Sequence, residues 1–224
     1  MLYIVATPIG NLKDITLRGL ETLASVDGII CEDTRRTSIL LESYQIKKPL
    51  KILNDFNEAK NVNELVNLVK SENWALVSDA GTPLISDPGY KLVRECLAQN
   101  IPIDSLPGPS SVITALTLSG LPPDKFIFLG YPPEKSGHRL KLLQNIHDRK
   151  QNEYLKATYI MFASPHKLLT IISDIKEIFG DIEIVLAHEL TKIHQSVETK
   201  TISKWLETLV SPKGEYVLLF NLVQ

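Results

Sequence analysis

The sequence predicts an α/β protein with two domains, and two observations lead to this fold class. In the first half, short aliphatic runs of β type alternate with amphipathic stretches, which is the pattern of successive βαβ units. Such a series forms a mostly parallel, twisted sheet that is covered by helices. In the second half the β-type runs are more frequent, which predicts a mixed, partly antiparallel sheet with helices.

The elements follow in order along the chain. In the first half we expect strands at residues 2–5, 28–31, 50–53, 75–77 and 102–106, and helices at residues 17–25, 36–44, 58–71, 89–99 and 110–118. The segment Ser119-Gly120-Leu121-Pro122-Pro123 then ends the pattern, because prolines after a glycine stop a helix. We therefore expect an N-terminal domain at residues 1–119 and a C-terminal domain at residues 120–224. In the second domain we expect strands at residues 126–130, 158–162, 182–187, 196–201 and 215–222, and helices at residues 137–149, 166–178 and 203–210.

Composition and cysteine content limit the function classes. The apolar runs fall far short of the roughly 20 residues that cross a bilayer, so no membrane segment is expected. The first residues lack a basic segment and predict a strand instead of a signal peptide. Cys31 and Cys96 are isolated, which fits a reducing cytoplasm and predicts no metal site.

The charge distribution bears on nucleic-acid binding. The formal net charge is −2, so any RNA contact must come from a local patch of cations. The segment from Lys135 to Lys156 is the best candidate, because its cations outnumber its acids. Charge alone equally allows a solvated helix face there.

Four loops that follow expected strands are unusual, and ligands in open α/β sheets bind at this edge. They span residues 6–11, 32–36, 78–89 and 107–111. In the third loop the small residues Ala80, Gly81 and Thr82 allow a ligand to approach the backbone. Folding alone explains Asp87 and Pro88 as the start of a helix, and residues 107–111 equally fit a rigid turn before a Ser-capped helix. The motifs GxGxxG, GxxxxGK[ST], HExxH and GxSxG are missing from the sequence, which disfavours dinucleotide, NTPase, metalloprotease and hydrolase functions.

Several blocks of this sequence, in this order, resemble the small-subunit rRNA ribose-2′-O-methyltransferase I family. The matching blocks are residues 2–12 (LYIVATPIGNL), Asp14–Thr16, Glu32–Arg35, residues 75–83 (ALVSDAGTP), Asp87–Tyr90, Leu106–Pro109 and Glu189–Lys192. The resemblance implies the tetrapyrrole-methylase superfamily, with two α/β domains, S-adenosylmethionine in the cleft between them and a homodimer. It also implies 2′-O-methylation of a decoding-centre cytidine in 16S rRNA, as free RNA or as the 30S subunit.

The resemblance also assigns candidate residues. Those implied to contact the cofactor are Ile9, Ala80, Gly81, Thr82, Ile85, Ser110, Ser111, Ala163 and Leu190. A ribose hydroxyl is a poor nucleophile, so a general base would help, and the candidates are Glu189, Lys192 (if its pKa is lowered) and Asp79. Glu189 and Lys192 rank first because they adjoin Leu190, which is implied to contact the cofactor. An ordinary ion pair explains Glu189 and Lys192 equally well. We expect phosphate contacts from Arg35, Arg36, Lys135 and Arg139.

Departures from the family pattern leave two further interpretations open. The usual H-x-H-N-E segment is Asn54-Asp55-Phe56-Asn57-Glu58 here, Ala163 stands for a glutamate, and Gln195 replaces another. These changes also fit a catalytically impaired protein that binds RNA or cofactor. A tetrapyrrole-type small-molecule methyltransferase would share the fold and cofactor, but residues 6–11 match the rRNA family better than the GxGPGD loop of precorrin methylases.

Overall fold

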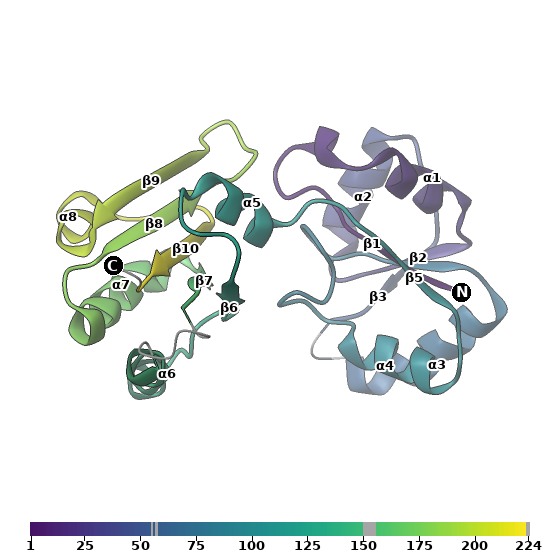
Figure 1. Ribbon diagram of the computed structural model, residues 1–224. Coiled ribbons are helices and arrows are strands. Elements are labelled where there is room, and N and C mark those ends of the chain that lie inside the picture. Colours follow the sequence, from purple (N-terminus) through teal and green to yellow (C-terminus); the bar gives the residue numbers. More distant parts are fainter. Residues whose placement is uncertain (55, 57, 150–155, 223–224) are drawn as a thin grey trace. The chain divides into compact units, whose positions relative to one another are not determined.

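The computed structural model describes residues 1–54, 56, 58–149 and 156–222. The chain forms two compact units, Met1–Ser110 and Ser111–Gln224 (Figure 1). Each unit contains one five-stranded sheet. The expected α/β fold with two sheets is therefore confirmed.

The first unit is a doubly wound, parallel α/β domain. Its elements are β1 (Leu2–Val5), the short 3₁₀ helix η1 (Leu12–Asp14), α1 (Leu17–Ser25), β2 (Gly28–Cys31), α2 (Thr34–Ser43), β3 (Leu50–Ile52), α3 (Glu58–Ser71), β4 (Trp74–Leu76), α4 (Tyr90–Ala98) and β5 (Ile103–Leu106). The strand order is β3-β2-β4-β1-β5, and each neighbouring pair is parallel. The carboxyl ends of β2, β4, β1 and β5 therefore meet at one edge of the sheet.

Both faces of this sheet are buried. Because successive strand side chains point to opposite faces, Ile29 belongs to a core cluster with residues of α1 and α2, and Ile30 belongs to a second cluster with residues of α3 and α4. Figure 1 shows α1 and α2 on one side of the sheet and α3 and α4 on the other. This two-sided burial explains why the three inner strands, β2, β4 and β1, are almost continuously apolar, whereas the edge strands β3 and β5 include Lys51, Asp104 and Ser105.

The second unit has a mixed sheet. Its elements are α5 (Ser111–Leu118), β6 (Phe126–Phe128), α6 (Ser136–Arg149), β7 (Thr158–Ala163), α7 (Pro165–Phe179), β8 (Glu183–His188), β9 (Ser196–Thr201), α8 (Ile202–Thr208) and β10 (Tyr216–Asn221). The strand order is β6-β7-β10-β8-β9, in which β6 and β7 are parallel and the other pairs are antiparallel. The expected mixed sheet is confirmed.

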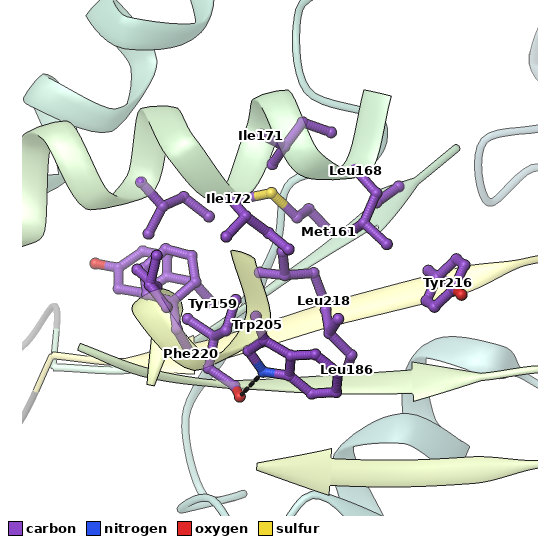
Figure 2. Packing of buried hydrophobic residues seen from close by; sticks show 14 of the residues in the cluster. Tyr159, Met161, Leu168, Ile171, Ile172, Leu186, Trp205, Tyr216, Leu218 and Phe220 are labelled. Carbon is purple, nitrogen blue, oxygen red and sulfur yellow. Dashed lines mark hydrogen bonds between the residues drawn. The ribbon is translucent and has the colours of Figure 1, made fainter. Parts of the chain in front are cut away.

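A single apolar cluster joins this sheet to its helices. Met161, Leu186 and Leu218 from three neighbouring strands pack with side chains of α6, α7 and α8 (Figure 2). The buried Trp205 of α8 donates its indole N–H to the carbonyl oxygen of Ile184 at 3.2 Å. Its large ring therefore lies in the core without an unsatisfied donor.

The boundary between the two units lies earlier in the sequence than the pattern of elements predicted. We expected the boundary at residues 119 and 120, whereas the compact units divide at Ser110 and Ser111. The reason is that α5 contacts β10 and therefore belongs to the second unit. The glycine and prolines at residues 120–123 form a connection inside that unit. Among the described residues, no helix combines the length and apolar character that spanning a membrane requires.

Candidate functional site

The carboxyl edge of the first sheet brings three sequence-distant loops together. Thr7, just after β1, and Gly81, after β4, form an isolated antiparallel bridge with two N–H···O bonds of 2.8 and 3.0 Å. The hydroxyl of Thr82 donates to the carbonyl of Pro109, after β5, at 3.0 Å. Gly81 has φ +83°, and a Cβ there would lie 3.2 Å from Cγ2 of Ile9. Glycine therefore permits both the left-handed backbone and the close approach of Ile9.

The structure places the implied cofactor residues as follows. In the first unit, Ile9 and Gly81 are buried, Thr82 and Ser110 are half-buried, and Ala80 and Ile85 are exposed, while Ser111, the first residue of the second unit, is half-buried. In the second unit, Ala163 ends β7 and Leu190 follows β8, and both are buried. Ile9, Gly81 and Thr82 thus lie close together around the Thr7–Gly81 bridge, and the carboxyl edge of the first sheet also carries Ala80, Ile85 and Ser110.

The loop between β4 and α4 is strained and is held by a buried carboxylate. Leu84 and Ser86 have φ of 74° and 68°, a region that non-glycine residues rarely adopt. Gly89 has φ +121° and, as N-cap of α4, offers no capping side chain. Glu58 of α3, which is 6% exposed, supplies the cap instead, because its Oε1 accepts the N–H groups of Gly89 and Lys91 at 3.0 Å each. Glu58 thus fixes the C-terminal end of this loop.

Sequence reasoning missed the role of Glu58. Its signal was a carboxylate in the first turn of one helix, together with a following helix that begins at a glycine. Asn54 and Phe56 precede Glu58 in the sequence, and Phe56 is 95% exposed. Asp55 and Asn57 of the same segment lie outside the described residues.

Acids and arginines are paired near the end of β2. The Nη2 atom of Arg35 lies 2.6 Å from Asp33, and the pKa of the Asp33 carboxyl is lowered to about 2, mainly by its hydrogen bonds with Arg35. Asp79 accepts the N–H of Asp33 at 3.1 Å and lies 3.4 Å from Nε of Arg36. Burial raises the pKa of Asp79 above its ordinary value, although Arg36 lowers it. Both arginine side chains stay largely exposed, so each presents a cation to solvent beside its acid.

A second polar cluster follows β8 in the second unit. The Nζ atom of Lys192 donates to Oε1 of Glu189 at 2.9 Å and to Oε2 of Glu215 at 3.0 Å. Oε1 of Glu189 also accepts the N–H of Glu215 at 2.9 Å. Glu189 and Thr191 have φ of 49° and 62°, so these contacts maintain a strained turn. Gln195 takes part as well, because its amide oxygen accepts the N–H of Thr191 at 2.6 Å.

The electrostatics of this cluster do not fit Lys192 as a general base. Burial lowers the pKa of Lys192, but its hydrogen bonds to Glu189 and Glu215 outweigh burial and raise the pKa above the ordinary value. The hydrogen bond from Lys192 lowers the pKa of Glu189. The condition for a basic lysine, a lowered pKa, is therefore not met, and Lys192 is an ammonium ion at neutral pH.

The phosphate role expected for Arg139 does not fit its position. Its side chain is 2% exposed, its Nε forms an ion pair with Asp174, and its Nη1 donates to the carbonyls of Pro133 and Glu134 at 2.9 and 3.1 Å. The guanidinium is thus a buried structural group on the inner face of α6. Lys135 is exposed and forms no ion pair with another described residue. Residues 150–155 of the same basic segment lie outside the described part of the chain.

Among the described residues, no three or more His, Cys, Asp and Glu side chains gather in a group that could hold a metal ion. Cys31 and Cys96 are both buried and form no disulfide.

Comparisons with known proteins place this architecture. A family profile for tetrapyrrole (corrin/porphyrin) methylases matches residues 1–205. The crystal structure of a diphthine synthase superposes with a TM-score of 0.73 over 98% of this chain and 89% of that chain, at 16% sequence identity, which shows a shared fold.

Curated relatives are similar over nearly the whole chain. The protein named ribosomal RNA small subunit methyltransferase I from Thermotoga maritima is 49% identical, and the match covers 98% of this chain and 97% of that protein. The protein of the same name from Mycoplasmopsis pulmonis is 44% identical, and the match covers 100% of this chain and 98% of that protein. The Rickettsia prowazekii protein of the same name is 46% identical over 98% of this chain and 78% of its own. The chain therefore belongs to the tetrapyrrole methylase family, and within it to the ribosomal RNA small subunit methyltransferase I proteins.

Proposed function

We propose that this protein transfers a methyl group from S-adenosylmethionine to the ribose 2′-oxygen of a decoding-centre cytidine in 16S rRNA. The observation that carries the proposal is the set of relatives named ribosomal RNA small subunit methyltransferase I, which are 43–49% identical over nearly the full chain. The tetrapyrrole methylase profile and fold support S-adenosylmethionine as the donor.

The loops at the carboxyl edge of the first sheet fit such a cofactor. Ala80 and Gly108 are exposed and Ser110 is half-exposed, and their small side chains would let a nucleoside approach the backbone beside the Thr7–Gly81 bridge. In this proposal the residues that contact the cofactor are Ile9, residues 80–82, Ile85 and Ser110 of the first unit and Ser111, Ala163 and Leu190 of the second. When bound, the cofactor supplies an electrophilic methyl group, and the protein supplies orientation and exclusion of water.

The proton of the attacking hydroxyl needs an acceptor. Of the three candidates, Asp79 has a raised pKa, which strengthens it as a base, whereas the pKa of Glu189 is lowered and Lys192 is protonated. We therefore rank Asp79 first and assign Glu189 to the positioning of Lys192. In single-turnover methylation, Asp79→Asn should lose much more rate than Glu189→Gln. Equal losses would argue against this ranking.

RNA phosphates need exposed cations. Lys135 is suited to this role because it is exposed and forms no ion pair with a described residue, and Arg35 and Arg36 offer guanidinium groups that are paired yet largely exposed. Arg139 is excluded by its burial. We further propose a homodimer in the cytoplasm, as the family resemblance implies. Light scattering that gives the monomer mass of 25.1 kDa would contradict the dimer.

One assay tests the function. The purified protein is incubated with radiolabelled S-adenosylmethionine and, in parallel, with 16S rRNA, 30S subunits and tetrapyrroles. We expect label in one of the RNA substrates, at a ribose. Label in a tetrapyrrole, or RNA binding without transfer, would overturn the proposal in favour of a small-molecule enzyme or an inactive relative. Mass spectrometry of 16S rRNA from a strain without the protein then identifies the missing methyl group.

A further inference from the structure

The second unit presents an exposed aromatic side chain, Tyr131, at the edge where β6 and β7 end. These two strands are parallel, so the loop after Phe128 and the end of β7 lie at the same edge of the sheet. The ring of Phe162 lies 4.9 Å from the ring of Phe128 and 5.3 Å from that of Tyr131, measured between centroids. Tyr131 is 63% exposed, whereas the two phenylalanines are half-buried. The tyrosine ring is therefore in tilted contact with Phe162 and remains largely exposed to solvent.

The backbone that follows Tyr131 is held by the buried guanidinium of Arg139. Its Nη1 binds the carbonyls of Pro133 and Glu134, and its Nε binds Asp174 of α7. A buried ion pair contributes little net stability, because removing both charges from water costs about as much as their attraction returns. The pair instead fixes the position of residues 133 and 134, because Arg139 of α6 binds their carbonyl groups while Asp174 of α7 holds Arg139 in place. The segment from Tyr131 to Lys135 is thus held at both ends, which lowers the entropy lost when it binds a ligand.

A cation lies at the far end of the same segment. Lys135 is exposed, and its carbonyl accepts the N–H groups of His138 and Arg139 at 3.1 Å, which fixes its backbone to the first turn of α6. An exposed aromatic ring can stack on the base of a single-stranded nucleotide, and a nearby lysine can bind its phosphate. Tyr131 and Lys135 offer these two groups on one segment. Stacking does not depend on the identity of the base, since every base has a π face.

We propose that Tyr131 stacks on an unpaired base of the RNA substrate and that Lys135 contacts a phosphate near that base. This inference rests on the proposed function and adds a substrate contact to it. It also gives a reason for the buried pair of Arg139 and Asp174, which holds the segment in a conformation that can bind RNA.

The main experiment compares Tyr131→Ala with Tyr131→Phe in steady-state methylation of the RNA substrate. Tyr131→Ala should lower kcat/KM for RNA by roughly 5- to 100-fold, through KM, because that range corresponds to the loss of one base–aromatic stack. Tyr131→Phe keeps the ring and should stay within about twofold of the wild type on the same reasoning. Val210→Ala, which truncates a side chain of the same unit that is 80% exposed, is the control for general surface effects. The affinity for S-adenosylmethionine should not change in any of these variants.

A direct binding measurement separates this inference from the proposed function. A single-stranded RNA with one 2-aminopurine is titrated with the full-length protein, and stacking is followed as fluorescence quenching. Quenching by the wild type and by Tyr131→Phe, but not by Tyr131→Ala, supports the stack whether or not methyl transfer occurs. Equal quenching by all three proteins, or an equal loss of kcat/KM in the Phe and Ala variants, overturns it. A wild type that quenches but transfers no methyl group counts against the proposed function alone.

The role of Lys135 has its own matched pair of variants. Lys135→Ala should reduce the slope of log K against log salt by about one contact, whereas Lys70→Ala, at an exposed lysine in the last turn of α3, should leave the slope unchanged. Equal slopes in the two variants would remove Lys135 from the proposal.

Discussion

Glu58 should stabilise the first unit through the two hydrogen bonds that it accepts at the start of α4. The carboxylate is 6% exposed and accepts the N–H groups of Gly89 and Lys91 at 3.0 Å each. Alanine leaves both donors without this acceptor, and Gly89 is buried, so its N–H has little access to water. A hydrogen bond to a charged group contributes about 1.5–3 kcal/mol. Because the N–H of Lys91 can be partly hydrated, Glu58→Ala should lower the free energy of unfolding by about 2–4 kcal/mol.

The control variant is Glu64→Ala on the same helix. Glu64 is 61% exposed and pairs with Lys51 at 2.8 Å, and exposed pairs contribute about 0–1 kcal/mol. The chain has two tryptophans, Trp74 in β4 and Trp205 in α8, so a Trp205→Phe background leaves Trp74 as the fluorescent reporter of the first unit. Denaturant unfolding is measured for both variants in that background. Equal stability losses in the two variants would refute the capping argument.

Three further predictions concern single contacts. Gly81→Val should lower the free energy of unfolding by about 1–2 kcal/mol, because its backbone has φ +83° and the new side chain would press on Ile9. It should also weaken S-adenosylmethionine binding in calorimetric titration. An unchanged affinity would remove this loop from the cofactor site. Arg139→Met should lower the stability of the second unit by about 3–5 kcal/mol, because it leaves Asp174 buried without its partner, and a paired Asp174→Leu change should restore much of the loss in thermal unfolding; no recovery would contradict the ion-pair argument. The pKa of Glu189 is lowered from 4.5 in the folded protein, so the stability that its carboxylate contributes is present above that pH and is lost as the pH falls through the folded pKa. Glu189→Gln should therefore flatten the fall in Tm below about pH 4.5. A Tm that depends on pH as in the wild type would contradict this.

The secondary structure was largely predictable because its signals are local. The strand at residues 2–5 and the helix at residues 17–25 have the predicted bounds, and Thr16 caps that helix by accepting the N–H of Gly19. Alternating apolar positions need only a few neighbouring residues to be recognised. The strand-end loops could be predicted once the strands were placed, because a parallel sheet gathers the carboxyl ends of its strands at one edge.

The contacts that the sequence did not reveal join residues that are distant along the chain. Arg139 looked like part of an exposed basic helix face, but its partner Asp174 lies 35 residues later on another helix. Glu58 caps a helix whose N-cap residue, Gly89, lies 31 residues later. Charge and periodicity identify an ionisable side chain, but they do not say which face of a helix will be covered by a later element.

The same limit decides the chemistry of the two polar clusters. From the sequence, Glu189 and Lys192 ranked ahead of Asp79 as the base, because the pKa values that reverse this order depend on neighbours that folding brings together. Glu215 reaches Lys192 from 23 residues away and, with Glu189, keeps it protonated, whereas Asp79 is partly removed from water and its pKa rises. A turn that holds a cation suits contact with an anionic substrate, and a partly buried acid with a raised pKa suits proton transfer. The electrostatics therefore favour Asp79 as the proposed base and the Lys192 turn as a proposed contact to the substrate.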